Sequence, residues 1–157
     1  MIDPAAVALL VRMWLSESGW DSARDHAAQG SIMVAAAEKS DLRTAIHRRV
    51  DRFSLANVRH PWLVEIDSSC RAPILYPGKW PVEKCRILVD RAIDLLQGRI
   101  ADPCRGKATG WRAKWAPKLH GKRKSKALRK ALKKGYTRVW CGRTNNAYVN
   151  EKRNRKP

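Results

Sequence analysis

The stretch WLSESGWDSARDHAA, residues 14–28, ends one predicted helix and begins the next. Asp3-Pro4 opens the first helix, because Asp caps a helix N-terminus and Pro suits its first position. Apolar side chains then recur at helical spacing as Val7, Leu10, Val11 and Trp14. The pattern stops at Ser18-Gly19, where Gly can adopt the left-handed conformation that ends a helix.

A second helix is predicted to begin at Ser22, whose spacing to Asp25 is that of a capping box, with Asp in place of the better Glu or Gln. Small side chains dominate one face of this helix, so another helix can approach it closely and a central position is expected. Ser40-Asp41 is expected to cap a third helix that carries Ala45, Ile46, Val50 and Phe53.

The rest of the chain alternates irregular and helical segments. Residues 54–80 are predicted to be irregular because Pro and Gly interrupt every pattern, and Trp80-Pro81 then opens the clearest helix, which Gly98 ends. Three further elements are predicted: a short basic helix over residues 125–134 stopped by Gly135, a short strand over 136–141 and a frayed end over 150–157. The fold class is therefore α+β and mainly α, a helical body with a small β element and a basic C-terminal segment.

Positive charge is concentrated in the last third of the chain, which has 157 residues and a formal net charge of +19. Residues 1–104 hold 14 Lys+Arg and 13 Asp+Glu, a net of +1, whereas residues 105–157 hold 19 Lys+Arg and one acid, Glu151, a net of +18. We therefore predict a balanced body over 1–104 and a basic segment over 105–157 that packs on it and meets a polyanion. Nucleic acid, anionic lipid headgroups and acidic wall polymers are the candidate partners, and a solvated basic tail is the alternative.

The sequence contains no apolar run of the roughly 18–20 residues that span a membrane. The longest run, residues 5–11, follows Asp3-Pro4 instead of a basic region and is a poor secretory signal. The protein is therefore expected to be made in the host cytoplasm and to act elsewhere only after release or transport.

Neither a metal site nor a cofactor is expected from the cysteines and histidines. Cys70, Cys85, Cys104 and Cys141 are spaced too widely for a zinc knuckle, and the histidines show no HExxH pattern. Two disulfides are possible, and a Cys104–Cys141 bond would staple the basic segment to the body. Four buried thiols in a reducing cytosol are the alternative.

The chain has seven Trp and one Phe, an unusual balance. Exposed indoles stack on sugar rings or bases, whereas buried indoles fill cores. Trp14 and Trp140 are predicted to fill the core. Two roles stay open for the tryptophans of the loops and the basic segment, which can line a ligand groove or fill the core. These are Trp62, Trp80, Trp111 and Trp115.

Glu17 is the candidate catalytic residue, because it lies at the C-terminal end of an apolar helix, close in sequence to Trp14 and Trp20. A carboxyl half-buried against aromatic rings, at the negative end of a helix dipole, keeps its proton to a higher pH. Such an acid can protonate a glycosidic oxygen. The alternative is an ordinary surface glutamate at a helix end.

The stretch from Trp14 to Ala28, followed by Ile32, resembles the opening of the SleB-type cell-wall hydrolases. In this resemblance Glu17 falls on the catalytic Glu, Asp21 on the acid of the following turn, and His26 stands where the family usually has Gln. Two later segments also resemble family motifs: Asp102-Pro103-Cys104, after the helix that ends at Gly98, and Cys141-Gly142-x-Thr144-x-Asn146-x-Tyr148, which is similar to a segment that closes the substrate groove.

The resemblance implies a lysozyme-like fold and a monomeric enzyme that cleaves the muramic acid–glucosamine bond of peptidoglycan. Glu17 would be first the acid and then the base, forming a 1,6-anhydro product as in lytic transglycosylases, and Asp25 is assigned to the helix cap. The predicted sugar-contacting residues are His26, Trp62, Tyr76 and Tyr148. A bacteriophage endolysin or a virion-borne muralytic protein would suit such an enzyme.

A nucleic-acid-binding protein without catalytic activity is the competing hypothesis. The basic helix could lie along phosphates, and Trp111 and Trp115 could stack on bases. Under either hypothesis the predicted polyanion-binding residues are Lys122, Arg123, Lys124, Lys126, Arg129, Lys130, Lys133 and Lys134. The charge-balanced first 104 residues and the arrangement of Trp14, Glu17 and Gly19 favour the enzyme.

Overall fold

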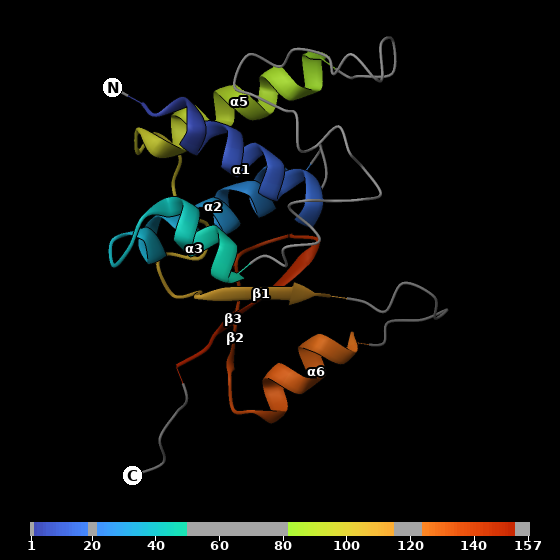
Figure 1. Cartoon of the computed structure of the whole chain (residues 1–157). Helices are drawn as coiled ribbons and strands as arrows, with labels where there is room; N and C mark the ends of the chain where they lie inside the picture. The colour runs from blue at the N-terminus through green and yellow to red at the C-terminus, as the bar shows by residue number, and fades with distance from the viewer. Residues whose placement is uncertain (1, 19–21, 50–81, 115–123, 153–157) are drawn as a thin grey trace. The chain divides into compact units, whose positions relative to one another are not determined.

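The structure is a computed structural model, which describes residues 2–18, 22–49, 82–114 and 124–152 (Figure 1). The described elements are α1 (Pro4–Glu17), α2 (Ala23–Ala37), α3 (Leu42–Arg49), α5 (Val82–Leu96), β1 (Gly110–Ala113), α6 (Lys126–Lys133), β2 (Thr137–Val139) and β3 (Asn146–Asn150). The fold is therefore α+β and mainly helical, which confirms the predicted class. The lysozyme-like arrangement stays a prediction.

The described residues fall into two compact units. The first contains α1, α3, α5 and the end of α2 from Met33 onward; the second contains residues 22–32, β1, α6, β2 and β3. The second unit thus includes the beginning of α2 together with the basic segment.

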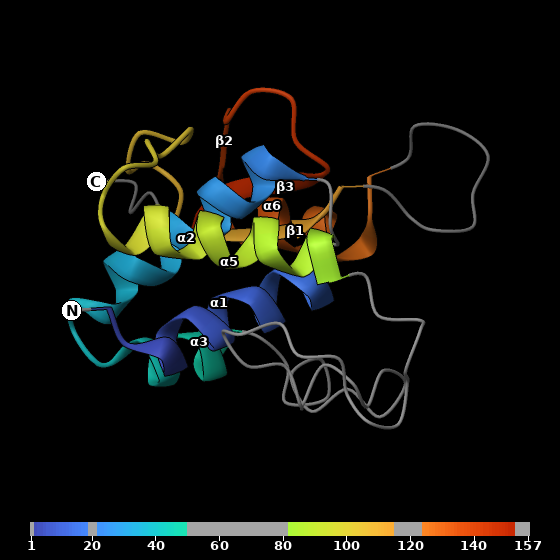
Figure 2. The ribbon, with the colours of Figure 1, turned by 90° about the horizontal axis from the view of Figure 1, so that it is seen from above.

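The first unit is built from apolar helix faces. The carboxylate of Asp3 caps α1 by accepting the Ala5 N–H at 2.9 Å, and Pro4 follows at the first helical position, both as predicted. In Figure 2, α1 runs between α5 and α3, and it contacts both helices. The side chains in this core include Leu10, Val11, Met13, Trp14, Ile46, Leu88 and Ala92, all buried. The prediction that Trp14 fills the core is confirmed.

Gly98 ends α5 as the sequence predicts. Its φ of 71° lies in the left-handed region, its N–H donates to the Leu95 carbonyl at 3.0 Å, and the Arg99 N–H donates to the Asp94 carbonyl at 2.8 Å. These two hydrogen bonds satisfy carbonyls that have no hydrogen-bond partner within the helix.

The second unit is an antiparallel sheet in the order β1-β3-β2, with β3 in the centre. Successive side chains of β3 point to opposite faces. Ala147 and Val149 pack with Leu128 of α6 on one face, whereas Tyr148 points to Asp25 near the start of α2 on the other. Because both faces are covered, the side chains of β3 from Asn146 to Val149 are all buried.

The predicted basic helix is confirmed as α6. The Ser125 hydroxyl caps it by accepting the Leu128 N–H at 3.0 Å, and Gly135 stops it, with its N–H bonded to the Leu132 carbonyl at 3.0 Å. Leu128 is buried on the sheet side of this helix, and Leu132 is partly buried. The 3.6-residue period therefore leaves the basic side chains of α6 on the solvent side.

The strands were only partly predicted. The strand expected over 136–141 is β2, but β1 and β3 were not predicted. The expectation of a frayed end from Asn150 is wrong for residues 150–152, because the Glu151 N–H donates to the Thr109 hydroxyl at 2.8 Å and the Glu151 carboxylate pairs with Arg112 at 3.0 Å.

Within the described ranges, no helix is both long and apolar enough to cross a membrane.

Candidate functional site

Glu17 is the last residue of α1 and is partly exposed. Trp14 lies three residues earlier, so the two share a helix face, and the indole of Trp14 is fully buried. The Ser18 N–H donates to the Trp14 carbonyl at 2.8 Å and closes the last turn. The carboxylate is therefore held at the end of a helix whose inner side is anchored in the first unit's core. Gly19, Trp20 and Asp21 lie outside the described residues.

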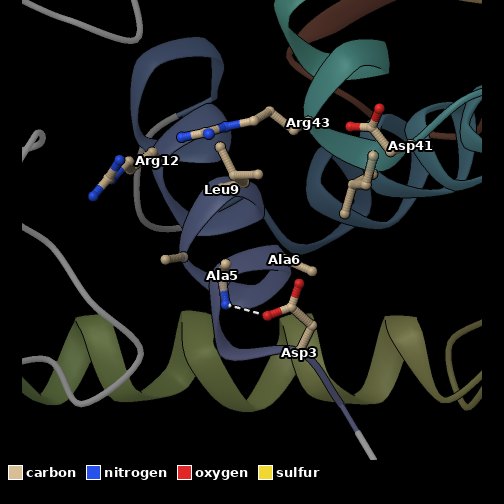
Figure 3. A pocket seen from close by; sticks show the side chains of 9 residues that line it. Asp3, Ala5, Ala6, Leu9, Arg12, Asp41 and Arg43 are labelled. Atoms are coloured by element: carbon tan, nitrogen blue, oxygen red, sulfur yellow. Dashed lines mark hydrogen bonds between the residues drawn. The ribbon is translucent and has the colours of Figure 1, made fainter.

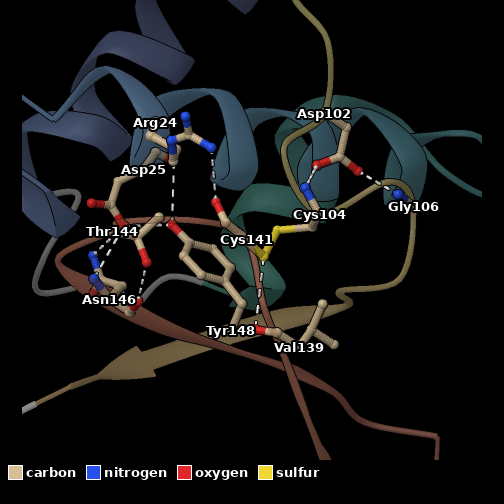
Figure 4. Close-up of a disulfide and its surroundings, with 10 residues drawn as sticks. All are labelled: Arg24, Asp25, Asp102, Cys104, Gly106, Val139, Cys141, Thr144, Asn146 and Tyr148. Carbon is tan, nitrogen blue, oxygen red and sulfur yellow. Dashed lines mark hydrogen bonds between the residues drawn. A yellow bond between two sulfur atoms is a disulfide. The ribbon is translucent and has the colours of Figure 1, made fainter.

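Asp25 is the most constrained carboxylate among the described residues, and it is fully buried in the second unit (Figure 4). Oδ1 accepts the Tyr148 hydroxyl at 2.7 Å and the Asn146 N–H at 3.1 Å, while Oδ2 accepts the Asn145 N–H at 2.7 Å. The Ser22 hydroxyl also donates to Oδ2. One carboxylate thus connects the start of α2 to the start of β3.

These contacts shift two pKa values in opposite directions. Burial acts to raise the pKa of Asp25, but hydrogen bonds from Ser22, Tyr148 and the N–H groups of Asn145 and Asn146 outweigh it, so the pKa is lowered. Burial, followed by the bond to Asp25, raises the pKa of the Tyr148 phenol. Asp25 is therefore a fixed anion and Tyr148 a fixed donor, and neither is poised to exchange a proton near neutral pH.

A disulfide joins Cys104 to Cys141, which is the bonded alternative of the two that the sequence left open (Figure 4). Both cysteines belong to the second unit. The loop before the bond is ordered by Asp102, whose carboxylate accepts the Cys104 N–H at 2.8 Å and the Gly106 N–H at 2.7 Å. Cys85 on α5 is also disulfide-bonded, so the alternative of four buried thiols is wrong. Cys70 lies outside the described residues.

Gly142 follows the disulfide where the chain approaches α2. Its φ is 79°, and a Cβ added to it would lie 2.3 Å from the Nη1 atom of Arg24. The same guanidinium nitrogen donates to the Cys141 carbonyl at 3.4 Å. The left-handed backbone therefore favours glycine here, and any larger residue would also have to displace the end of the Arg24 side chain.

The structure corrects the predicted roles of several side chains. Tyr148 and His26, expected to contact sugar, are 1% and 0% exposed and present no surface to a ligand. Trp140, expected in the core, is 77% exposed, whereas Trp111 is buried on β1 opposite Tyr148. These assignments depended on local sequence, and the sheet that decides them brings together residues far apart in the chain.

Six of the predicted polyanion-binding residues lie in the described part of the chain, and all are exposed. They are Lys124, Lys126, Arg129, Lys130, Lys133 and Lys134. The other two, Lys122 and Arg123, lie outside the described residues, as do Trp62, Tyr76, Trp80 and Trp115. Positive charge on one side of α6 can bind an anionic polymer through many weak contacts.

A pocket of about 370 Å³ lies between α1 and α3 in the first unit (Figure 3). Its acidic lining residues, Asp3 and Asp41, are engaged as caps of these two helices. Its cationic lining residues, Arg12 and Arg43, lie near one another, and burial together with the charge of Arg43 lowers the pKa of Arg12. The pocket offers positive charge to an anion but no group placed for proton transfer. Glu17 does not line it.

In the described ranges, no cluster of three or more His, Cys, Asp or Glu side chains could hold a metal ion. Comparison with models of protein families finds no match, and neither curated proteins nor solved structures show a relative. The resemblance to cell-wall hydrolases therefore rests on its motif residues alone.

The role of Asp25 was missed by sequence reasoning, which assigned it to a helix cap. The Ser22–Asp25 contact of that assignment exists, but most of the carboxylate's hydrogen bonds go to residues about 120 positions later. A signal was present in Asn146-x-Tyr148, where donor-bearing side chains alternate along a strand. A buried carboxylate elsewhere in the chain is the partner that such donors require.

Proposed function

We propose that the protein is a muralytic enzyme that cleaves the muramic acid–glucosamine bond of peptidoglycan, with Glu17 as the catalytic acid and base. One observation carries the proposal: residues 22–28 of the first resembling segment meet the two later segments in the second unit, while Glu17 belongs to the first unit. Asp25 binds Tyr148 and the backbone of Asn146, and Cys104 is bonded to Cys141. Contacts that join three segments distant in sequence support a shared architecture better than sequence spacing alone.

The carboxylates support a reaction that uses a single acid. An inverting or retaining hydrolase needs a second carboxyl at a defined distance from the first. Asp25 is the nearest described carboxylate after Glu17 in sequence, but both of its oxygens are occupied by buried donors. Glu17 would protonate the bond oxygen and then take the proton of the muramyl C6 hydroxyl, which gives a 1,6-anhydro end without a second carboxyl.

The disulfide supports a site of action outside the reducing cytosol. Disulfides persist in the periplasm and at cell surfaces, where the peptidoglycan lies. We therefore propose that the protein is made in the host cytoplasm and acts at the wall after release, or is carried there in a phage virion. The exposed basic side chains of α6 would hold it on anionic wall or membrane surfaces.

The direct test compares Glu17→Gln with the unmodified protein on purified peptidoglycan. Turbidity and released anhydromuropeptides are measured, and we expect the variant to lose about three orders of magnitude in rate, because general acid–base catalysis typically contributes 10²–10⁴-fold. Glu38→Gln, the same change at an exposed residue just after α2, is the matched control and should keep full activity. Digestion by Glu17→Gln at the normal rate would remove Glu17 from the mechanism.

Nucleic-acid binding is the second candidate, and the exposed basic side of α6 is the observation that favours it. If the folded protein releases nothing from peptidoglycan but binds duplex DNA with an affinity that falls steeply with salt, this candidate replaces the enzyme. Neutralising Lys126, Lys130 and Lys133 together should then reduce the slope of log K against log salt concentration by about three, because each phosphate contact displaces close to one counterion.

A further inference from the structure

Trp140 is a large aromatic side chain that the second unit leaves in solvent. Its exposure is 77%, and Ile87, at 54%, is the other large hydrophobic residue exposed in the described part of the chain. The indole stands directly after the edge strand β2 and directly before the disulfide-bonded Cys141. A single exposed hydrophobic residue is ordinary on a protein surface. The position of this indole beside a hollow lined by cationic residues is what makes it a candidate ligand platform.

Trp140 lines a hollow of about 510 Å³. Its described lining residues are Lys107, Thr137, Arg138, Val139, Trp140, Asn150 and Lys152. Three of these are cationic and none is acidic. The volume lies within the roughly 300–1,000 Å³ of small-molecule sites. The hollow thus combines an apolar platform with positive charge, which suits a ring that bears an anionic group.

Each cationic residue of the hollow comes from an anchored piece of backbone. Lys107 ends the loop tied down by Asp102, with its N–H bonded to the Cys104 carbonyl at 3.0 Å. Arg138 is paired with Val149 in the sheet, and the Lys152 N–H donates to the Asn150 side chain at 2.9 Å. The Cys104–Cys141 bond links the Lys107 loop to the segment that carries Trp140. Such preorganisation reduces the entropy lost on binding.

We propose that this hollow binds an anionic sugar, with the pyranose ring stacked on Trp140 and its carboxylate held by Arg138 and the neighbouring lysines. The flat indole matches the apolar face of a pyranose, and a guanidinium matches a carboxylate with two parallel hydrogen bonds. Thr137 and Asn150 add polar side chains at the rim. A single platform within a hollow favours a sugar over single-stranded nucleic acid, which stacks successive bases on several aromatic rings.

The inference rests on the proposed function for the choice of glycan, because muramic acid is a pyranose that carries a carboxylate. The site would then be an accessory wall-binding site of the second unit, whose lining residues do not include Glu17. Binding at this site does not require catalysis. It can therefore be measured in the Glu17→Gln variant, which does not cut the probe. Loss of lysis and loss of binding are thus distinct results.

The experiment measures, by calorimetry at low salt, binding of a peptide-free glucosaminyl–muramyl tetrasaccharide to the Glu17→Gln protein. Chitotetraose, which has four rings and no carboxylate, is the neutral comparison and should bind at least fivefold more weakly. Trp140→Ala should weaken tetrasaccharide binding at least tenfold, Trp140→Tyr should stay within about threefold, and Arg138→Ala should weaken it at least fivefold. Circular dichroism should show no change, since both side chains are exposed.

Arg143→Ala is the matched control, because it removes an exposed arginine of the same unit that does not line the hollow. We expect it to change binding by less than twofold. The proposal is overturned if Arg143→Ala costs as much as Arg138→Ala, since binding would then be general charge attraction. It is also overturned if Trp140→Ala binds normally, or if a twenty-residue thymidine oligonucleotide binds more tightly than the tetrasaccharide with the same Trp140 dependence. Tetrasaccharide binding that depends on Trp140, in a protein whose unmodified form releases nothing from peptidoglycan, would support the site and contradict the enzyme.

Discussion

The two compact units are stabilised in different ways. In the first, α1 packs against α3 and α5 through fully buried apolar side chains such as Leu10, Trp14 and Ile46. In the second, the apolar cluster of Leu128, Ala147 and Val149 is accompanied by a buried carboxylate that accepts hydrogen bonds from Tyr148 and Asn146. Each unit contains disulfide-bonded cysteine, Cys85 in the first and Cys104 with Cys141 in the second. The first unit therefore depends mainly on apolar packing beside its disulfide, whereas the second adds hydrogen bonds of fixed geometry around a buried charge.

This difference matters for where binding groups can be held. Hydrogen bonds and covalent links fix both orientation and position, whereas apolar packing fixes position mainly through shape. The exposed indole of Trp140 and the cationic rim around it lie in the unit with the fixed contacts. Glu17 lies at the end of a helix in the other unit, anchored through Trp14.

Removing the disulfide should produce the largest stability effect and should affect the second unit first. Cys104 and Cys141 are 37 positions apart, and a closed loop of that length stabilises a fold by about 4 kcal/mol in the chain-entropy model. The double variant Cys104→Ala/Cys141→Ala should lose amide-exchange protection in β1, β2 and β3, while α1 and α5 keep theirs. Equal loss in α1 and α5 would show that the units unfold together and would end the contrast between them.

Replacing the buried carboxylate should have the next largest effect. Asp25→Asn puts an amide N–H₂ among groups that all donate, so we expect a loss of roughly 3 kcal/mol in the free energy of unfolding. Tyr148→Phe removes one bond to the same carboxylate and should cost about 2 kcal/mol. Denaturant unfolding followed by circular dichroism measures both, and a smaller loss for Asp25→Asn than for Tyr148→Phe would contradict the central role of Asp25.

Asp25 should also make stability depend on pH. Its pKa is lower in the folded protein than the roughly 3.9 of an unfolded chain. Its contribution is therefore complete above about pH 4 and is lost as the pH falls through the folded-state value. The melting temperature of Asp25→Asn should be lower than that of the unmodified protein but flatter between pH 5 and pH 2. Asp90→Asn, the same change at an exposed residue of α5, is the control and should keep the steep dependence.

Two glycines allow the smallest and sharpest comparison. Gly98→Ala, after α5, meets no atom within 4 Å and should cost about 1 kcal/mol for its left-handed backbone alone. Gly142→Ala has the same backbone requirement and also displaces Arg24, so it should cost about 2 kcal/mol. Equal thermal denaturation of the two variants would mean that the contact between Gly142 and Arg24 contributes nothing.

The helices were predictable because their signals are local. Asp3 and Pro4 start α1, Ser125 starts α6 and Gly98 stops α5, and each acts on atoms within a few residues. The sheet was not predictable in the same way, since β1 and β3 are about 35 residues apart and neither shows a clear alternation of polar and apolar residues. Both faces of β3 are buried, which removes the period-two pattern that usually reveals a strand.

The candidate site was predictable only in part, for the same reason. Glu17 was chosen from its local context, and the structure shows a helix end there. The Cys104–Cys141 bond was one of two alternatives, and the structure shows the disulfide. The surroundings of Tyr148 and Trp140 were misjudged because burial depends on which strand or helix covers a residue. Asp25 contacts residues about 120 positions away, and no local pattern specifies such a partner.

The central strand has one more property, which concerns insertions. β3 is hydrogen-bonded to a strand along each edge. Its alternate side chains face two different interiors, one apolar and one polar. A single residue added directly before Tyr148 would move the phenol to the face that packs on Leu128 and put the inserted residue beside the Asp25 carboxylate. The fold should therefore tolerate a change in the length of β3 less well than a change in its composition.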